Sequence, residues 1–182
     1  MPQHHGAATA YARAVFDLAK ERGQVDEIGQ ELSAVVDQIK AEPALRDFFA
    51  RPWVTGPVKR ATALEIAGRL GLSQLTRDLV GLAALQGRAD QIGAIAEAYR
   101  DLVDRDRGRV RVAVRTAVPL TGEERSLLSA RLQRTLGGNE VLLEETVDHG
   151  LLGGFIAESG TYVVDGSLEG QLERMRHRLE TG

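Results

Sequence analysis

The feature that most constrains the fold is a change of hydrophobic period near residues 106–108. Before this point, apolar residues recur every three or four positions, which is the period of helices that bury one face. After it, Val110, Val112 and Val114 alternate with mostly basic residues, which is the period of a strand. We therefore expect a helical domain over residues 1–105 and an α/β domain over residues 106–182.

Prolines and glycines divide the first hundred residues into six segments with helical periodicity. Pro43 and Pro57 are placed to open the third and fourth helices, because proline fits the first turn of a helix. Gly71 is placed to close the fourth helix, and Ser73 to cap the fifth through its hydroxyl. This pattern predicts a six-helix bundle.

The second domain opens with the alternating strand and continues into a helix. Thr121 and Glu124 have the spacing of a capping box, and a glycine pair follows the helix. The apolar stripe of this helix consists of Leu127, Leu128, Leu132 and Leu136. Further strands are expected over residues 140–147, 154–158 and 161–165, and Ser167 is placed to cap a final helix. A strand–helix–strand unit favours a parallel pair, and the last two strands form a hairpin. The predicted class is α+β, with a small α/β domain built on a mixed sheet.

Composition excludes several kinds of active site. The chain has no cysteine, which removes disulfides, thiolate catalysis and Cys-type zinc sites. Its four histidines lack partners at metal-ligand spacing. We expect no catalytic residue, cofactor, metal or small-molecule substrate.

No apolar run approaches the ~20 residues of a membrane-spanning helix, so we expect no direct membrane insertion. The first six residues lack a signal-peptide pattern, which predicts a cytosolic protein.

Two local motifs resemble catalytic signatures but lack their key residues. Gly150, Gly153 and Gly154 are not followed by the lysine of a phosphate-binding loop, which favours a turn and close backbone approach. Ser167 lies where a helix cap belongs and lacks the spacing of a nucleophile elbow. Both motifs are therefore interpreted as structural.

One basic run, from Arg105 to Arg115, leaves an alternative function open. On the predicted strand, Arg109, Arg111 and Arg115 share a face that could follow nucleic-acid phosphates. Aromatic residues make up only 4% of the chain and none is interleaved with the arginines to stack on bases. A face that repels edge pairing or meets an acidic partner is the preferred interpretation, and a nucleic-acid-binding adaptor is the alternative.

Two helices carry more apolar surface than burial of one face requires, the first and the fifth. Such helices either lie at the centre of the bundle or frame a groove for a partner helix, and the pattern leaves both open. The candidate groove residues are Tyr11, Ala14, Val15, Leu18, Leu75, Leu79, Leu82 and Ala83. In the final helix a single stripe consists of Leu168, Leu172, Met175 and Leu179, at steps of four, three and four.

Several stretches resemble the family of the F-type ATP synthase delta subunit, which includes the mitochondrial oligomycin-sensitivity-conferring protein. They are YARAVFDLA at residues 11–19, VDHGLLGG at 147–154 and GTYVVDGS at 160–167. Phe49 to Pro52, followed by Lys59, is similar to the join between the family's third and fourth helices. The sequence departs from the family at Gln86 and at the His149-Gly150 turn. The structural motif so assigned consists of Asp148, Gly153, Gly154, Gly160, Asp165 and Ser167.

The resemblance implies a non-catalytic stator subunit in the peripheral stalk, at the cytoplasmic face of a bacterial cell membrane. Its helical bundle would bind the N-terminal helix of an alpha subunit. Its C-terminal domain would hold the end of the b subunits, for which the stripe from Leu168 to Leu179 is the candidate. The connector would resist rotor torque during proton-driven ATP synthesis.

Overall fold

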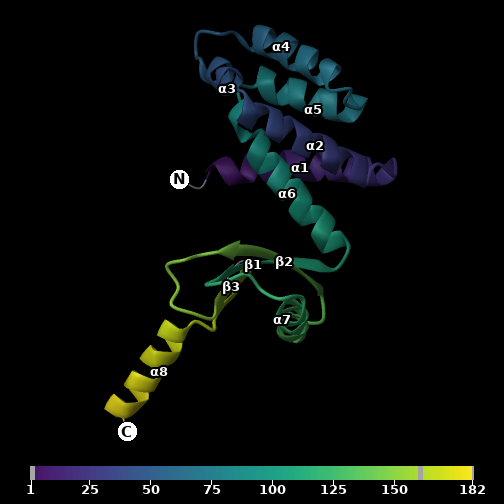
Figure 1. Ribbon diagram of the computed structural model, residues 1–182. Helices are drawn as coiled ribbons and strands as arrows, with labels where there is room; N and C mark the ends of the chain where they lie inside the picture. The colour runs from purple at the N-terminus through teal and green to yellow at the C-terminus, as the bar shows by residue number, and fades with distance from the viewer. Residues whose placement is uncertain (1–2, 160–161, 182) are drawn as a thin grey trace. The chain divides into compact units, whose positions relative to one another are not determined.

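The computed structural model describes residues 3–159 and 162–181 (Figure 1). The chain divides into two compact units between Val103 and Asp104. This division falls inside the helix that leads into the first strand, two residues before the boundary expected from the change of period. Within the described residues the structure has eight α-helices and one four-stranded sheet, so its class is α+β.

The helical unit begins with two long helices, followed by shorter ones and a single 3-10 turn. Its elements are α1 (Gln3–Glu21), α2 (Val25–Ala41), α3 (Pro43–Ala50), α4 (Gly56–Arg69), α5 (Gln74–Leu85), η1 (Ala89–Gln91) and α6 (Ile92–Asp106). The predicted helix boundaries are confirmed at several points. Pro43 opens α3, Gly71 follows α4 with a φ of 67°, and Ser73 caps α5 by accepting from the Thr76 N–H.

Two apolar clusters make up the core of this unit, and α5 contributes to both. The first joins α1, α2, α5 and α6 around the fully buried Tyr99, whose ring meets Phe16 edge to face. The Tyr99 hydroxyl donates to the Val25 carbonyl at 2.9 Å, which satisfies its one polar atom. The second cluster joins α2, α4, α5 and the start of α6. The helix α5 is thus a central element of the unit.

Two long-range polar contacts fix helix ends within the helical unit. The Glu31 carboxylate, on α2, accepts from the backbone N–H of Ser73 at 2.5 Å, from the Ser73 hydroxyl at 2.7 Å and from the Thr76 hydroxyl. It therefore places a negative charge at the N-terminus of α5, where the helix dipole favours one. The buried Lys59 ammonium donates to the Phe49 carbonyl at 2.6 Å, near the C-terminal end of α3.

The second unit contains a mixed sheet with the strand order β2-β1-β3-β4. Its elements are β1 (Arg109–Thr116), α7 (Gly122–Thr135), β2 (Glu140–Val147), β3 (Phe155–Ser159), β4 (Tyr162–Asp165) and α8 (Leu168–Thr181). The strands β1 and β2 are parallel, with Arg109 opposite Glu140, whereas β3 is antiparallel to both β1 and β4. The predicted parallel crossover and mixed sheet are confirmed.

The helix α7 packs against the sheet (Figure 1). The capping box is present, because the Thr121 hydroxyl accepts from the Glu124 N–H and the Glu124 carboxylate accepts from the Thr121 N–H. Leu128 and Leu132 are buried against the strands. The prediction that Leu127 shares their stripe is wrong, since its side chain is 66% exposed. It lies next to Leu128 in sequence and so about 100° further around the helix.

Candidate partner-binding surfaces

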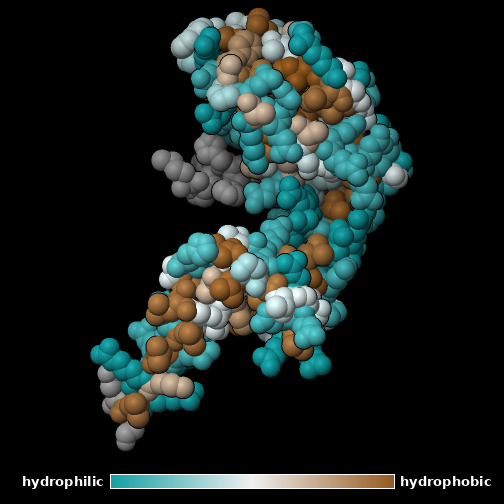
Figure 2. Space-filling model, in the orientation of Figure 1, coloured by the Kyte–Doolittle hydropathy of each residue, from teal (hydrophilic) through white to brown (hydrophobic). Residues whose placement is uncertain are grey.

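The final helix carries an uncovered apolar stripe. Its four predicted partner-binding residues have exposed fractions between 47% and 85%, and they are Leu168, Leu172, Met175 and Leu179. Figure 2 shows the stripe as an apolar band along α8. A soluble protein rarely leaves a continuous apolar surface of this kind without a partner, so α8 is a candidate interface.

A set of hydrogen bonds around Ser167 holds the start of α8 in place. The Ser167 hydroxyl accepts from the Gly170 N–H at 3.0 Å, which confirms the predicted cap. The same hydroxyl donates to the Asp165 carboxylate at 2.6 Å, and the Ser167 N–H donates to it at 2.8 Å. These bonds, the side-chain one first, lower the pKa of Asp165 below its ordinary value. The base of α8 is therefore hydrogen-bonded to the end of β4, although its stripe is exposed.

The glycine-rich turn before β3 packs against the start of α8. A Cβ on Gly154, whose φ is 81°, would lie 2.3 Å from the Gly166 carbonyl oxygen, so only glycine fits there. A Cβ on Gly153 would lie 2.6 Å from the Leu168 side chain. Asp148 closes the preceding turn by accepting from the Gly150 N–H at 2.9 Å. The motif therefore performs a structural role, and its Gly160 lies outside the described residues.

In the helical unit, the structure separates the eight predicted groove residues into two sets. Four are buried in the two apolar clusters and pack against the unit's own helices: Val15, Leu75, Leu79 and Ala83. For these four, the sequence pattern left open whether they were core or interface, and the structure places them in the core. They therefore offer little accessible surface to a partner.

The other four predicted residues are at least partly accessible. Ala14 is exposed, Leu18 and Leu82 are 40% and 43% exposed, and Tyr11 is half-buried. The Arg88 guanidinium lies 5.8 Å from the centre of the Tyr11 ring, which brings the segment after α5 next to α1. Of the eight predicted groove residues, these four are thus the ones with accessible side chains, fewer than the sequence suggested.

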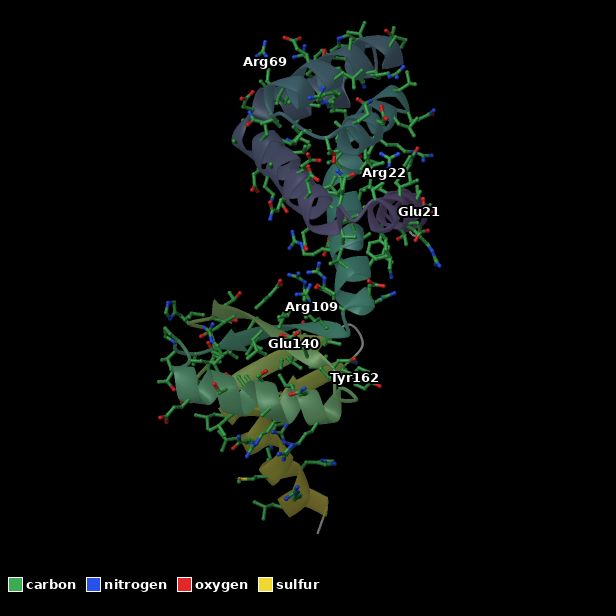
Figure 3. All side chains as sticks on the ribbon, turned by 90° about the vertical axis from the view of Figure 1, so that its right-hand side faces the viewer. Glu21, Arg22, Arg69, Arg109, Glu140 and Tyr162 are labelled. Carbon is green, nitrogen blue, oxygen red and sulfur yellow. The ribbon has the colours of Figure 1, made fainter. Side chains whose placement is uncertain are left out.

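The arginines of β1 have acidic partners from neighbouring elements. Figure 3 shows Arg109 at the end of the sheet that also holds Glu140. The ion pairs are Arg109 and Arg111 with Asp104, Arg111 with Glu144, and Arg115 with Asp148 and Glu158. Because these carboxylates already neutralise the arginine face, it offers little net positive charge to a nucleic acid. Sequence periodicity alone could not find Asp104, because it belongs to the preceding helix.

One cavity in the apolar core of the helical unit is too small to hold a substrate. The narrow apolar cavity between α2, α4 and α5 has a volume of about 20 Å³, which is space for about one water molecule. Across residues 3–159 and 162–181, no three His, Asp or Glu side chains gather as a metal site would require. In the same residues, no helix is both long and apolar enough to cross a membrane.

The fold, a helical unit followed by a small mixed-sheet unit, is similar to that of chains in two ATP synthase structures. A chain in the mitochondrial ATP synthase hexamer of Toxoplasma gondii superimposes with a TM-score of 0.71. The alignment covers 94% of this chain and 96% of that one, at 20% sequence identity. A chain of the Polytomella F-ATP synthase aligns with a TM-score of 0.50 over 53% of this chain and 84% of its own length, at 21% identity.

Sequence similarity identifies the family. The sequence profile described as ATP synthase delta (OSCP) subunit matches residues 7–179. The ATP synthase subunit delta of Anaeromyxobacter sp. (strain Fw109-5) is 36% identical over 173 residues, which cover 95% of this chain and 96% of the relative. That of Hyphomonas neptunium is 36% identical over 175 residues, or 96% of each chain. The chain belongs to the ATP synthase delta (OSCP) subunit family.

Proposed function

We propose that this chain is the non-catalytic stator connector of an F-type ATP synthase, joining the catalytic head to the peripheral stalk. In this role the six helices of the first unit bind the N-terminal helix of an alpha subunit. The second unit binds the C-terminal end of the b subunits. The complex would lie at the cytoplasmic face of a bacterial membrane, and the chain would resist rotor torque during proton-driven ATP synthesis.

The uncovered stripe of α8 is the observation on which this proposal chiefly depends. Its steps of four, three and four place apolar residues only at the two core positions of a heptad. So narrow a stripe is typical of a seam between two helices, whereas a helix that packs on a sheet needs a wider face. Arg176 and Arg178 flank the second half of the seam. The partner that best fits α8 is therefore a helix with acidic flanking residues, as a stalk subunit would supply.

The four accessible side chains on α1 and α5 support the proposed binding to the catalytic head. They are Tyr11, Ala14, Leu18 and Leu82. Ala14 is small, which allows a partner helix to approach closely, and the side chains of Leu18 and Leu82 provide apolar contact area. Because α5 packs in both apolar clusters, this surface is joined to most helices of the unit. A connector needs such packing, because its task is to transmit force without making or breaking covalent bonds.

The stalk half is tested by titrating the full chain with the soluble segment of the b subunit from the same genome. We expect Leu172→Ala and Met175→Ala each to weaken binding by roughly threefold to thirtyfold, because each removes buried apolar area. Glu173→Ala, a truncation on the same helix outside the seam, should change affinity by less than about twofold. Equal affinities for all three variants would reject α8 as the stalk site.

The head half is tested with a peptide of the alpha subunit's N-terminal helix. Because Ala14 is exposed, Ala14→Asp should leave the helical circular dichroism unchanged and weaken peptide binding by about tenfold or more. Ala34→Asp, at an exposed alanine on α2, is the matched control and should bind as the wild type does. A folded Ala14→Asp variant with wild-type affinity would rule out this surface.

A further inference from the structure

The apolar stripe of α8 is complementary to itself when a second copy of the helix is turned end for end. Its apolar residues follow one another at steps of four, three and four, and this order reads the same in both directions. In an antiparallel pair, Leu168 therefore faces Leu179 of the second copy, and Leu172 faces Met175 of the second copy. Every apolar side chain of the stripe then meets an apolar side chain.

The stripe is uncovered, and its helix is already formed. None of the apolar clusters found in residues 3–159 and 162–181 contains a residue of α8, and the four side chains of the stripe are exposed. Figure 1 shows α8 extending away from the sheet. The Ser167 hydroxyl caps the helix by accepting from the Gly170 N–H. Pairing therefore does not have to bear the free-energy cost of starting the helix.

The charges beside the stripe favour the antiparallel arrangement, because residues that flank a seam between two helices set partner choice and orientation. One flank carries Glu169 and Arg176, and the other carries Gln171 and Arg178. In an antiparallel pair, each flank meets the same flank of the second copy. Glu169 then lies beside Arg176 of the second copy, and the reciprocal pair forms as well. Arg178 meets Gln171 of the second copy, so no like charges meet along either flank.

A parallel pair would lack these ion pairs. In that arrangement opposite flanks meet, which brings Gln171 beside Arg176 of the second copy. Glu169 then has no basic residue of the second helix across the seam. The charge pattern therefore fits a second copy of α8 in the antiparallel orientation.

We infer that the free chain self-associates through α8 as a two-fold symmetric, antiparallel pair. The symmetry makes each contact occur twice. The 14 residues of α8 span only about 21 Å, so the interface is small and its association is weak and concentration-dependent. The proposed function assigns the stalk to the same stripe. The pair would then cover this surface until a stalk subunit displaces the second copy, and this last step alone rests on the proposed function.

The pairing is tested by sedimentation equilibrium of the full chain at about 10–500 µM, a range in which weak pairs form. We expect a monomer–dimer equilibrium. Leu172→Asp should weaken it by about tenfold or more, because it places a charge in the seam. The helical circular dichroism should not change, since Leu172 is exposed. A wild type that stays monomeric throughout, or a Leu172→Asp variant that pairs equally well, would overturn the inference.

Charge-reversed variants test the orientation. Glu169→Arg and Arg176→Glu should each weaken self-association by about fivefold or more, since like charges then meet twice across the seam. An equimolar mixture of the two should pair about as tightly as the wild type, because each variant restores the other's opposite charge. Glu173→Arg, the same change outside the seam, should alter self-association by less than about twofold. A mixture that pairs no more tightly than its components would rule out the antiparallel arrangement.

Adding the soluble b-subunit segment separates this inference from the proposed function. If both are right, the segment converts the dimer into a complex that contains one copy of the chain. If the segment leaves the dimer intact, the assignment of α8 to the stalk falls, whereas the pairing, which is measured without the segment, stands. If the wild type is monomeric and Leu172→Ala still weakens binding of the segment, the pairing falls and the stalk assignment stands.

Discussion

The carboxylate of Glu31 is expected to contribute a large share of the stability of the helical unit. It accepts three hydrogen bonds at the N-terminus of α5, two from Ser73 and one from the fully buried Thr76. Removing the acceptor leaves these donors unsatisfied, and each such loss costs about 1 kcal/mol or more. We therefore expect Glu31→Ala to lower the free energy of unfolding by about 2–4 kcal/mol.

Replacing Glu31 with glutamine removes the negative charge but keeps nearly the same side-chain shape, so it separates the two contributions to stability. The amide keeps an oxygen for the Ser73 N–H, and the two hydroxyls can turn to accept from its NH₂ group. What is lost is charge assistance and the interaction with the helix dipole, together about 1 kcal/mol. The expected order of stability is therefore wild type, then Glu31→Gln, then Glu31→Ala.

The assay is urea denaturation followed by far-ultraviolet circular dichroism, with hydrogen exchange of the α5 amides as a local measure. Glu27→Ala on the same helix is the control, because its carboxylate accepts an exposed bond from Gln24, and it should cost less than about 0.5 kcal/mol. If Glu31→Ala were no more destabilising than Glu27→Ala, the long-range cap would not be a source of stability.

Three further predictions concern single contacts. Lys59→Met should lower the free energy of unfolding by about 1–3 kcal/mol, since the carbonyl near the end of α3 loses its buried donor, and an unchanged urea midpoint would contradict this. Gly154→Ala should cost more than about 2 kcal/mol in thermal denaturation, whereas Gly122→Ala, with open space around it, should cost far less. The folded-state pKa of Asp165 lies below its unfolded value, so its stabilising contribution is complete above that value and is lost as pH falls through the folded pKa. Asp165→Asn should therefore flatten the acid side of the stability profile, and a Ser167→Ala variant should do so in part.

Local signals in the sequence predicted much of the fold. The capping residues Ser73, Thr121 and Ser167 lie where their spacing predicts, because a cap depends on atoms only two or three residues away. The strand from Glu140 to Val147 has its predicted bounds, and the parallel pairing follows from the intervening helix.

Contacts between distant residues could not be predicted in this way. The bond from Glu31 to Ser73 spans 42 positions, and no periodic pattern relates the two residues. Periodicity also could not decide whether Leu79 and Leu82 lie in the core or at an interface. It shows which residues share a face of a helix, but not what packs against that face. The structure buries Leu79 and leaves Leu82 accessible. Likewise, only the packed unit reveals that Leu127 lies outside the core.

The connector role is tested most directly by asking whether the chain bridges two partners at once. Purified catalytic head and soluble b-subunit segment from the same genome would be mixed with and without the chain, and the complexes weighed by analytical ultracentrifugation. The account predicts one ternary complex that forms only when the chain is present, and that Ala14→Asp weakens attachment of the head while Leu172→Ala weakens attachment of the stalk. A chain that binds only one of the two, or a head and stalk that associate equally well without it, would contradict the proposal.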